Sequence, residues 1–165
     1  LARLLEQPQI SGVELQVAKF ARIIDGGIKD LLLTDLEHSL LDQLRNLLSN
    51  GKTPVLYTTR REYNFPNVQN RLDFGISLAE LMARLAVSLS PDLSYLICKG
   101  GITANILLSE GYEQKMVYLE GQILPGLSLV TPLDGCFQGL PIVTFPGNLG
   151  DADTLLDAWK FFESS

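Results

Sequence analysis

The chain has very few of the residues that metal centres and disulfide scaffolds require. Its 165 residues include two cysteines and one histidine. Cys98 and Cys136 do not follow a metal-binding spacing, and His38 has no second histidine to join it. This composition argues against a zinc site and against a disulfide framework, so we assign no residue as a metal ligand. With a single histidine on a helix surface, no Ser/His/Asp or Cys/His catalytic set can be assembled either.

Positive charge and long apolar runs are also missing. The net charge of −6 argues against a nucleic acid or an anionic membrane surface as a partner, because both attract basic proteins. No apolar run approaches the roughly 20 residues of a membrane span, and no signal-peptide pattern opens the chain. We therefore expect a cytoplasmic protein. A nucleotide remains open as a partner, since backbone amides hold phosphates without any net positive charge.

Apolar periodicity predicts alternating strands and helices in a chain with 46% hydrophobic residues. Strand patterns cover residues 13–20, 54–59, 93–98, 116–120, 127–131 and 141–145, and helix patterns cover residues 35–48, 77–90, 102–109 and 151–162. This alternation predicts one α/β domain over residues 1–165, a three-layer sandwich with a mostly parallel or mixed sheet and helices on both faces. Residues 1–7 resemble the tail of an amphipathic helix, so we expect the C-terminal part of a longer polypeptide.

Two segments need an interpretation of their own. Residues 60–75 show no period and predict a loop, which is long enough to suggest a function. Ser77 and Glu80 form a capping-box pattern that predicts the start of the following helix.

Residues 51–53 (Gly-Lys-Thr) resemble the end of a P-loop, but Asn46 stands where that motif needs glycine, and the local order runs from helix to strand. They predict a helix stop.

Three glycine segments in the last third of the chain are the most informative feature. We call residues 99–103 (Lys-Gly-Gly-Ile-Thr) the first glycine segment, residues 121–126 (Gly-Gln-Ile-Leu-Pro-Gly) the second, and residues 145–151 (Phe-Pro-Gly-Asn-Leu-Gly-Asp) the third. The first and third lie where a strand pattern gives way to a helix pattern, the place where α/β proteins present free N–H groups to anions. They predict a phosphate site. The alternative is a pair of turns that need glycine and bind nothing.

Charged residues beside these segments each allow two interpretations. Lys99 is either a cation for a phosphate or a solvated strand end. Arg60 and Arg61 are either a second basic contribution from the same sheet edge or ordinary surface charges. Asp151 either helps to hold Mg²⁺ through water or caps the terminal helix, and we favour the cap.

Together with residues 139–141 (Gly-Leu-Pro), the glycine segments closely resemble the C-terminal nucleotide-binding domain of the four-carbon acid sugar kinase family, over about residues 90–163. The resemblance implies ATP-dependent phosphorylation, with Mg²⁺, of a terminal hydroxyl on a four-carbon sugar acid such as a 3-oxo-tetronate. It also implies a separate N-terminal domain that binds the sugar acid and supplies the catalytic base. These 165 residues alone are therefore expected to be inactive. A homo-oligomer is left open.

The resemblance also implies which residues contact ATP. These residues are Gly100, Gly101 and Thr103 in the first segment, Pro125 and Gly126 in the second, and Gly147, Asn148 and Gly150 in the third. With Lys99 and Asp151 they complete the predicted site. Ile102 departs from the pattern, because many members carry an acidic residue there. A Gly-Ser segment that contributes to the family's nucleotide site would fall before Leu1.

Two other functions are compatible with the same residues. One is a non-catalytic module that senses a nucleotide or a sugar phosphate or docks a partner protein. The other is a degenerate domain that is retained only for packing between domains. Titration with ATP, with and without Mg²⁺, and with sugar phosphates distinguishes them.

Overall fold

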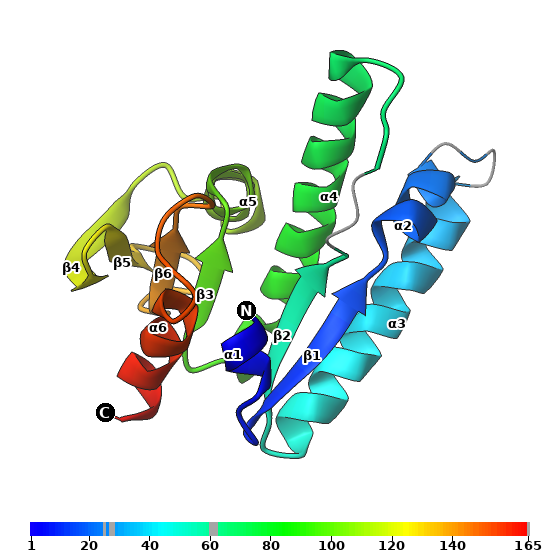
Figure 1. Cartoon of the computed structure of the whole chain (residues 1–165). Helices are drawn as coiled ribbons and strands as arrows, with labels where there is room; N and C mark the ends of the chain where they lie inside the picture. Colours follow the sequence, from blue (N-terminus) through cyan, green and yellow to red (C-terminus); the bar gives the residue numbers. More distant parts are fainter. Residues whose placement is uncertain (25, 27–28, 60–62, 165) are drawn as a thin grey trace. The chain divides into compact units, whose positions relative to one another are not determined.

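The computed structural model describes residues 1–24, 26, 29–59 and 63–164, and its helices and strands are drawn in Figure 1. The chain divides into two compact units. We call Gln7–Leu78 the two-stranded unit, and Leu1–Glu6 with Ala79–Ser165 the four-stranded unit. None of the helices in the described ranges is long and apolar enough to cross a membrane.

The two-stranded unit is built on a pair of parallel strands, β1 (Ile10–Leu15) and β2 (Thr53–Thr58). The connection between them contains α2 (Val17–Ile24) and α3 (Lys29–Ser49), and α3 packs against both strands. From Gly12 to Leu15 exposed and buried residues alternate along β1, as expected for a strand with one covered face. Phe20 of α2 is fully buried in the core of this unit.

The helix stop that the sequence predicts at Gly51 is confirmed. Gly51 has a φ of +68°, and its N–H donates to the carbonyl of Leu48 at 2.9 Å. The N–H of Lys52 donates to the carbonyl of Leu47 at 3.0 Å, which completes a Schellman-type end of α3. The Lys52 ammonium donates to the carbonyl of Pro8 at 2.8 Å. Residues 51–53 are therefore a helix end and not a phosphate-binding loop.

Three predictions for the first half of the chain are wrong. The first strand ends at Leu15, and residues 17–20 belong to helix α2. Helix α4 (Val68–Leu89) begins well before Ser77, so residues 68–75 of the expected loop are helical and the supposed capping box lies inside a helix. The cap is Asn67, whose side-chain oxygen accepts from the N–H of Asn70 at 2.8 Å.

The four-stranded unit contains a mixed sheet in the order β3-β6-β5-β4. Its strands are β3 (Leu96–Lys99), β4 (Val117–Leu124), β5 (Leu127–Pro132) and β6 (Ile142–Phe145). Strands β3 and β6 are parallel, whereas β5 is antiparallel to both β6 and β4. Its helical elements are α1 (Ala2–Leu5), the Ala79–Leu89 part of α4, η1 (Ser90–Asp92), α5 (Gly101–Ile106), the π-helical turn η2 (Leu107–Gly111) and α6 (Thr154–Glu163).

Helices cover both faces of this four-stranded sheet. Successive side chains of β6 point to opposite faces, and each face has its own buried cluster. Ile142 points into a cluster with residues of α4 and α5, among them Ala83 and Ala104. The next residue, Val143, points into a second cluster that includes Ala158 of α6. The predicted α/β sandwich with a mixed sheet and helices on both faces is therefore confirmed, and the described strands form two sheets.

Candidate functional site

The first and third glycine segments leave the sheet side by side. Strands β3 and β6 run parallel with Lys99 opposite Phe145, so both chains pass the same edge at their carboxyl ends. The N–H of Gly100 donates to the carbonyl of Phe145 at 2.9 Å, which joins the two segments directly. The prediction that they share one edge is confirmed.

The second glycine segment reaches the same edge by a different route. Residues 121–124 belong to strand β4, and Pro125 with Gly126 forms the turn into β5. Because β5 is antiparallel to β6, with Ser128 opposite Thr144, this turn lies beside the carboxyl end of β6. Gly126 has a φ of +81°, and a Cβ there would stand 2.6 Å from Cδ2 of Leu149. The second segment therefore needs glycine to approach the third so closely.

The first segment carries free amides at this edge. Gly100 has a φ of +128° and precedes α5, and its carbonyl accepts the first helical hydrogen bond, from Ala104 at 2.9 Å. The N–H groups of residues 101–103 have no recorded acceptor in the described ranges. A Cβ on Gly101 would have no atom within 4 Å, so the space beside this backbone is open. The hydroxyl of Thr103 lies next to Gly100.

The third segment carries amides of the same kind. Within it the N–H of Leu149 donates to the carbonyl of Pro146 at 3.2 Å. Among the residues that the structure describes, the N–H groups of Gly147, Asn148 and Gly150 have no acceptor. The position of a Cβ on Gly147 is also open, with no atom within 4 Å. Unsatisfied N–H groups beside open space can bind anionic oxygens.

Lys99 contacts the third segment, a role that the sequence analysis did not consider. Its ammonium group lies 3.2 Å from the carbonyl oxygen of Pro146 and 3.5 Å from that of Leu149. It also stands 3.7 Å from the centre of the Phe145 ring, within the range of a cation–π contact. Desolvation by these neighbours lowers the pKa of Lys99 below its ordinary value of 10.5.

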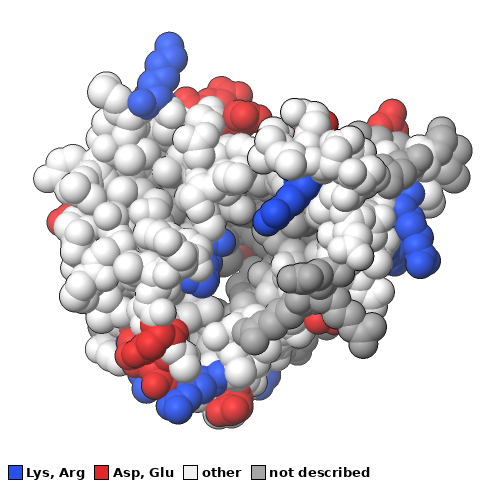
Figure 2. Space-filling view, turned by 45° about the horizontal axis from the view of Figure 1, so that its top comes forward, with Lys and Arg blue, Asp and Glu red and all other residues white. Residues whose placement is uncertain are grey.

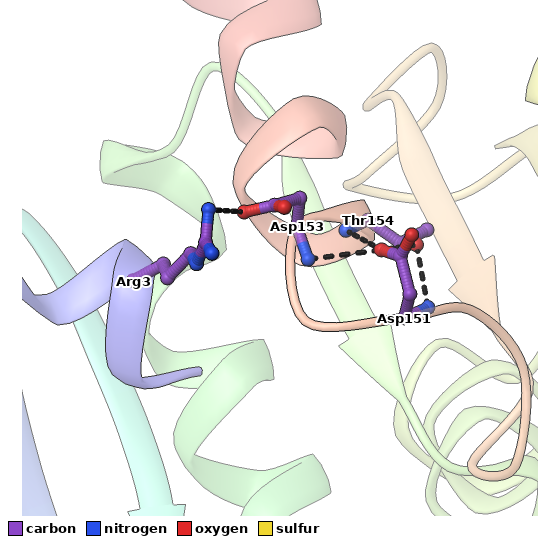
Figure 3. Close-up of polar contacts among 4 residues, drawn as sticks. All are labelled: Arg3, Asp151, Asp153 and Thr154. Carbon is purple, nitrogen blue, oxygen red and sulfur yellow. Dashed lines mark hydrogen bonds and ion pairs between the residues drawn. The ribbon is translucent and has the colours of Figure 1, made fainter.

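The N-cap residue of α6 is Asp153, but the side chain of Asp151, two residues earlier, does the capping that was predicted for it (Figure 3). Its Oδ1 accepts from the N–H of Asp153 at 2.9 Å, and from the N–H and hydroxyl of Thr154 at 3.0 and 2.8 Å. These donors favour the charged form and lower the pKa of Asp151, with the Thr154 hydroxyl as the largest cause. Thr154 was not among the predicted site residues, yet its hydroxyl accepts from the N–H of Asp151 at 2.9 Å, which makes the bonding between these two residues reciprocal, as in a capping box. Asp153 instead pairs with Arg3 of α1 at 2.8 Å.

Asp151 offers at most one carboxylate oxygen to a hydrated Mg²⁺. All hydrogen bonds recorded for this carboxylate use Oδ1, so its second oxygen can face water or a hydrated ion. The described residues include no group of three His, Cys, Asp or Glu side chains that could hold a metal by themselves. Mg²⁺ commonly binds through one or two carboxylates together with phosphate oxygens and water. Any such ion would therefore depend on the phosphates of a ligand.

Other charged and nucleophilic groups add little to this edge. Arg60 and Arg61 lie outside the described residues. Cys98 is buried near the end of β3, and burial raises the pKa of its thiol to about 11, which disfavours the reactive thiolate. On the face of the molecule in Figure 2, uncharged residues cover most of the surface, with basic and acidic side chains scattered among them. That face has no broad basic field.

A shallow hollow of about 320 Å³ lies elsewhere, between α2 and α3 of the two-stranded unit. Apolar residues such as Ile23 and Leu36 line it beside Lys19 and Arg22. Backbone amides within helices are already hydrogen-bonded, so this hollow lacks the free N–H groups that favour phosphates. The glycine edge is therefore the better candidate site.

The cap at Asp151 predicts a pH-dependent stability. Because the pKa of Asp151 is lower in the folded chain than its ordinary 3.8, the carboxylate stabilises the fold above pH 3.8 and stops doing so as the pH falls through the folded value. Asp151→Asn should unfold at lower urea concentration than the unchanged protein at pH 7, and this difference should shrink in acid. Asp157→Asn, which alters another carboxylate of α6, is the control. An equal difference at pH 7 and pH 3 would contradict the prediction.

Comparison with known proteins agrees with the fold and with the kind of site. A domain of unknown function (DUF1537) from Bordetella bronchiseptica, solved with bound citrate as a domain-swapped dimer, has the same fold in two crystal forms. In one form the identity is 18% with a TM-score of 0.61, over 97% of this chain and 35% of that one. In the other the identity is 21% with a TM-score of 0.65, over 97% and 36%.

The chain thus spans about a third of the length of these solved proteins. No curated protein matches the sequence. The family of nucleotide-binding C-terminal domains matches residues 1–155, nearly the whole chain. The chain belongs to this family of nucleotide-binding C-terminal domains.

Proposed function

We propose that this chain is the ATP-binding part of a kinase that phosphorylates four-carbon sugar acids, such as a 3-oxo-tetronate. The observation that carries the proposal is the gathering of unsatisfied N–H groups at one sheet edge, from residues 101–103 and from Gly147, Asn148 and Gly150. Membership of a nucleotide-binding family supports a nucleotide as the ligand. Pro125 and Gly126 bring the second segment to the same edge.

In the proposed reaction the γ-phosphoryl group of ATP passes to the terminal hydroxyl oxygen of the sugar acid. The hydroxyl proton goes to a base, and ADP is released. Such a transfer needs positioning and charge stabilisation more than covalent help from the protein, and amides at glycine turns can supply both. Mg²⁺, when bound, neutralises charge on the phosphate oxygens. Asp151 would hold it through water.

We further propose that residues 1–165 act as one nucleotide-binding domain, the C-terminal part of a longer two-domain kinase. The base and the sugar-acid site would belong to the other domain. The Bordetella bronchiseptica domain was solved with citrate, a hydroxy acid, which supports an acidic acceptor. Its domain-swapped dimer supports a homo-oligomer. The two free cysteines are compatible with a reducing compartment such as the cytoplasm.

Calorimetric titration of the chain with ATP tests the proposal. We expect binding in the range of roughly 0.1–1 mM, since only part of a site is present, and about tenfold tighter binding with Mg²⁺ than without it. A preference for four-carbon sugar phosphates over ATP would indicate a sensing module. If neither ligand binds, the chain would instead be a domain retained only for packing. Kinase activity of these residues alone would contradict the proposed division between two domains.

A further inference from the structure

We propose that Lys99 is a positioning residue for the phosphate site, because its ammonium group holds the third glycine segment with two amides turned toward the ligand. This inference rests on the proposed function and deepens it. Neither interpretation from the sequence, a direct phosphate cation or a solvated strand end, includes such a role. Lys99 would act through the two carbonyl oxygens that its ammonium group contacts, those of Pro146 and Leu149.

Peptide geometry links those carbonyls to the amides. In a trans peptide the C=O of one residue and the N–H of the next point to opposite sides, and the described backbone has no cis peptide bond. The carbonyl of Pro146 points toward Lys99, so the N–H of Gly147 points away from it. The carbonyl of Leu149 also faces Lys99, so the N–H of Gly150 points away as well. One ammonium group therefore orients both amides.

Other contacts hold the two ends of the third segment, where the N–H of Gly100 donates to Phe145 and Asp151 is hydrogen-bonded to Thr154, but few hold residues 147–150 between them. Its one internal backbone hydrogen bond joins Leu149 to Pro146, and its side-chain contact with the second segment is that of Leu149 beside Gly126. Lys99, by contrast, is anchored at the end of β3, which pairs with β6. An ammonium group has three donors, so it can serve two carbonyls and still lie over the Phe145 ring.

The charge of Lys99 gives the same arrangement a second effect. A cation behind the segment polarises the two carbonyls and makes the attached amides better donors. It also adds a positive potential at an edge of a chain whose net charge is −6. Methionine in place of lysine would keep much of the apolar stem but lose both effects. Arginine would keep the charge and the donors.

Amide NMR of the unliganded chain, combined with ATP titration, tests the inference. In Lys99→Met we expect the amides of residues 147–150 to show lower ¹⁵N–{¹H} NOE values and faster hydrogen exchange, and Mg²⁺–ATP to bind about tenfold to a hundredfold more weakly. Lys99→Arg should restore the order of the segment and most of the binding. Lys160→Met makes the same change of charge on α6 and should alter neither measurement.

The outcomes separate the inference from the proposed function. If Lys99→Met leaves residues 147–150 as ordered as before, the positioning role is overturned, even if ATP binding falls. If the segment loosens and ATP binding does not change, the link to the phosphate site is overturned. If the unchanged protein binds no ATP, the proposed function fails, whereas a loosened segment in Lys99→Met still supports the holding role of the lysine.

Discussion

Gly101→Val should weaken the binding of Mg²⁺–ATP by roughly a hundredfold while the protein stays folded, because two charge-assisted hydrogen bonds at about 1.5 kcal/mol each amount to about 3 kcal/mol. Gly101 is the first residue of α5, and its φ is not positive. No atom lies within 4 Å of a Cβ placed there, so the fold tolerates a side chain. The same open space is where phosphate oxygens would approach residues 101–103. A branched side chain fills it.

Gly75→Val is the matched control for this experiment. Gly75 also lies in a helix, α4, and also has no atom within 4 Å of an added Cβ. Both substitutions should change the free energy of unfolding by no more than about 0.5 kcal/mol, since valine and glycine differ little in helix propensity. Calorimetry with Mg²⁺–ATP, together with urea unfolding, measures both effects. Equal ATP affinity in the two variants would remove the first glycine segment from the site.

Gly150→Ala should have the largest effect on stability, a loss of about 3 kcal/mol of unfolding free energy. Gly150 has a φ of +84°, which alanine adopts only with strain. In addition, the new Cβ would stand 2.6 Å from the Thr154 hydroxyl oxygen and 2.7 Å from its Cβ. Thr154 cannot move away without giving up its hydrogen bonds to Asp151. The start of α6 should therefore loosen.

Gly139→Ala separates the two causes of this loss. Gly139 has a φ of +81°, nearly that of Gly150, but an added Cβ would meet no atom within 4 Å. Gly139→Ala should lower the free energy of unfolding only by the cost of backbone strain, about 1–2 kcal/mol. Urea unfolding of both variants at pH 7 gives the comparison. If Gly150→Ala and Gly139→Ala lower the free energy of unfolding by the same amount, steric crowding at Thr154 does not contribute to the loss, and this prediction is wrong.

Much of the second half of the fold is predictable because its signals are local. The strand patterns predicted between residues 93 and 145 correspond to strands, and the glycine turns that follow them coincide with positive φ at Gly100, Gly126 and Gly150. The first half is less predictable. Its long α4 begins at an asparagine cap among polar residues without a clear period, so the boundary depends on contacts that the local pattern does not contain.

The site shows the same division. The prediction that the first and third glycine segments suit phosphates follows from the residues themselves, since strand-to-helix turns rich in glycine leave amides free. The second segment differs, because the sequence does not reveal that residues 121–124 extend β4 into a hairpin that returns to β6. Leu149 and Thr154 fill the space beside Gly126 and Gly150, and no spacing rule indicates either contact.

By itself the sequence determined the α/β class, the glycine positions that allow positive φ, and the helix cap at Asp151, because each depends on residues close together in the chain. Only the tertiary structure decided that the segments meet at one edge, because strand pairing joins residues as distant as Lys99 and Phe145. It also decided the contacts of Lys99, because the carbonyl oxygens beside its ammonium group belong to residues 47 and 50 positions further along the chain.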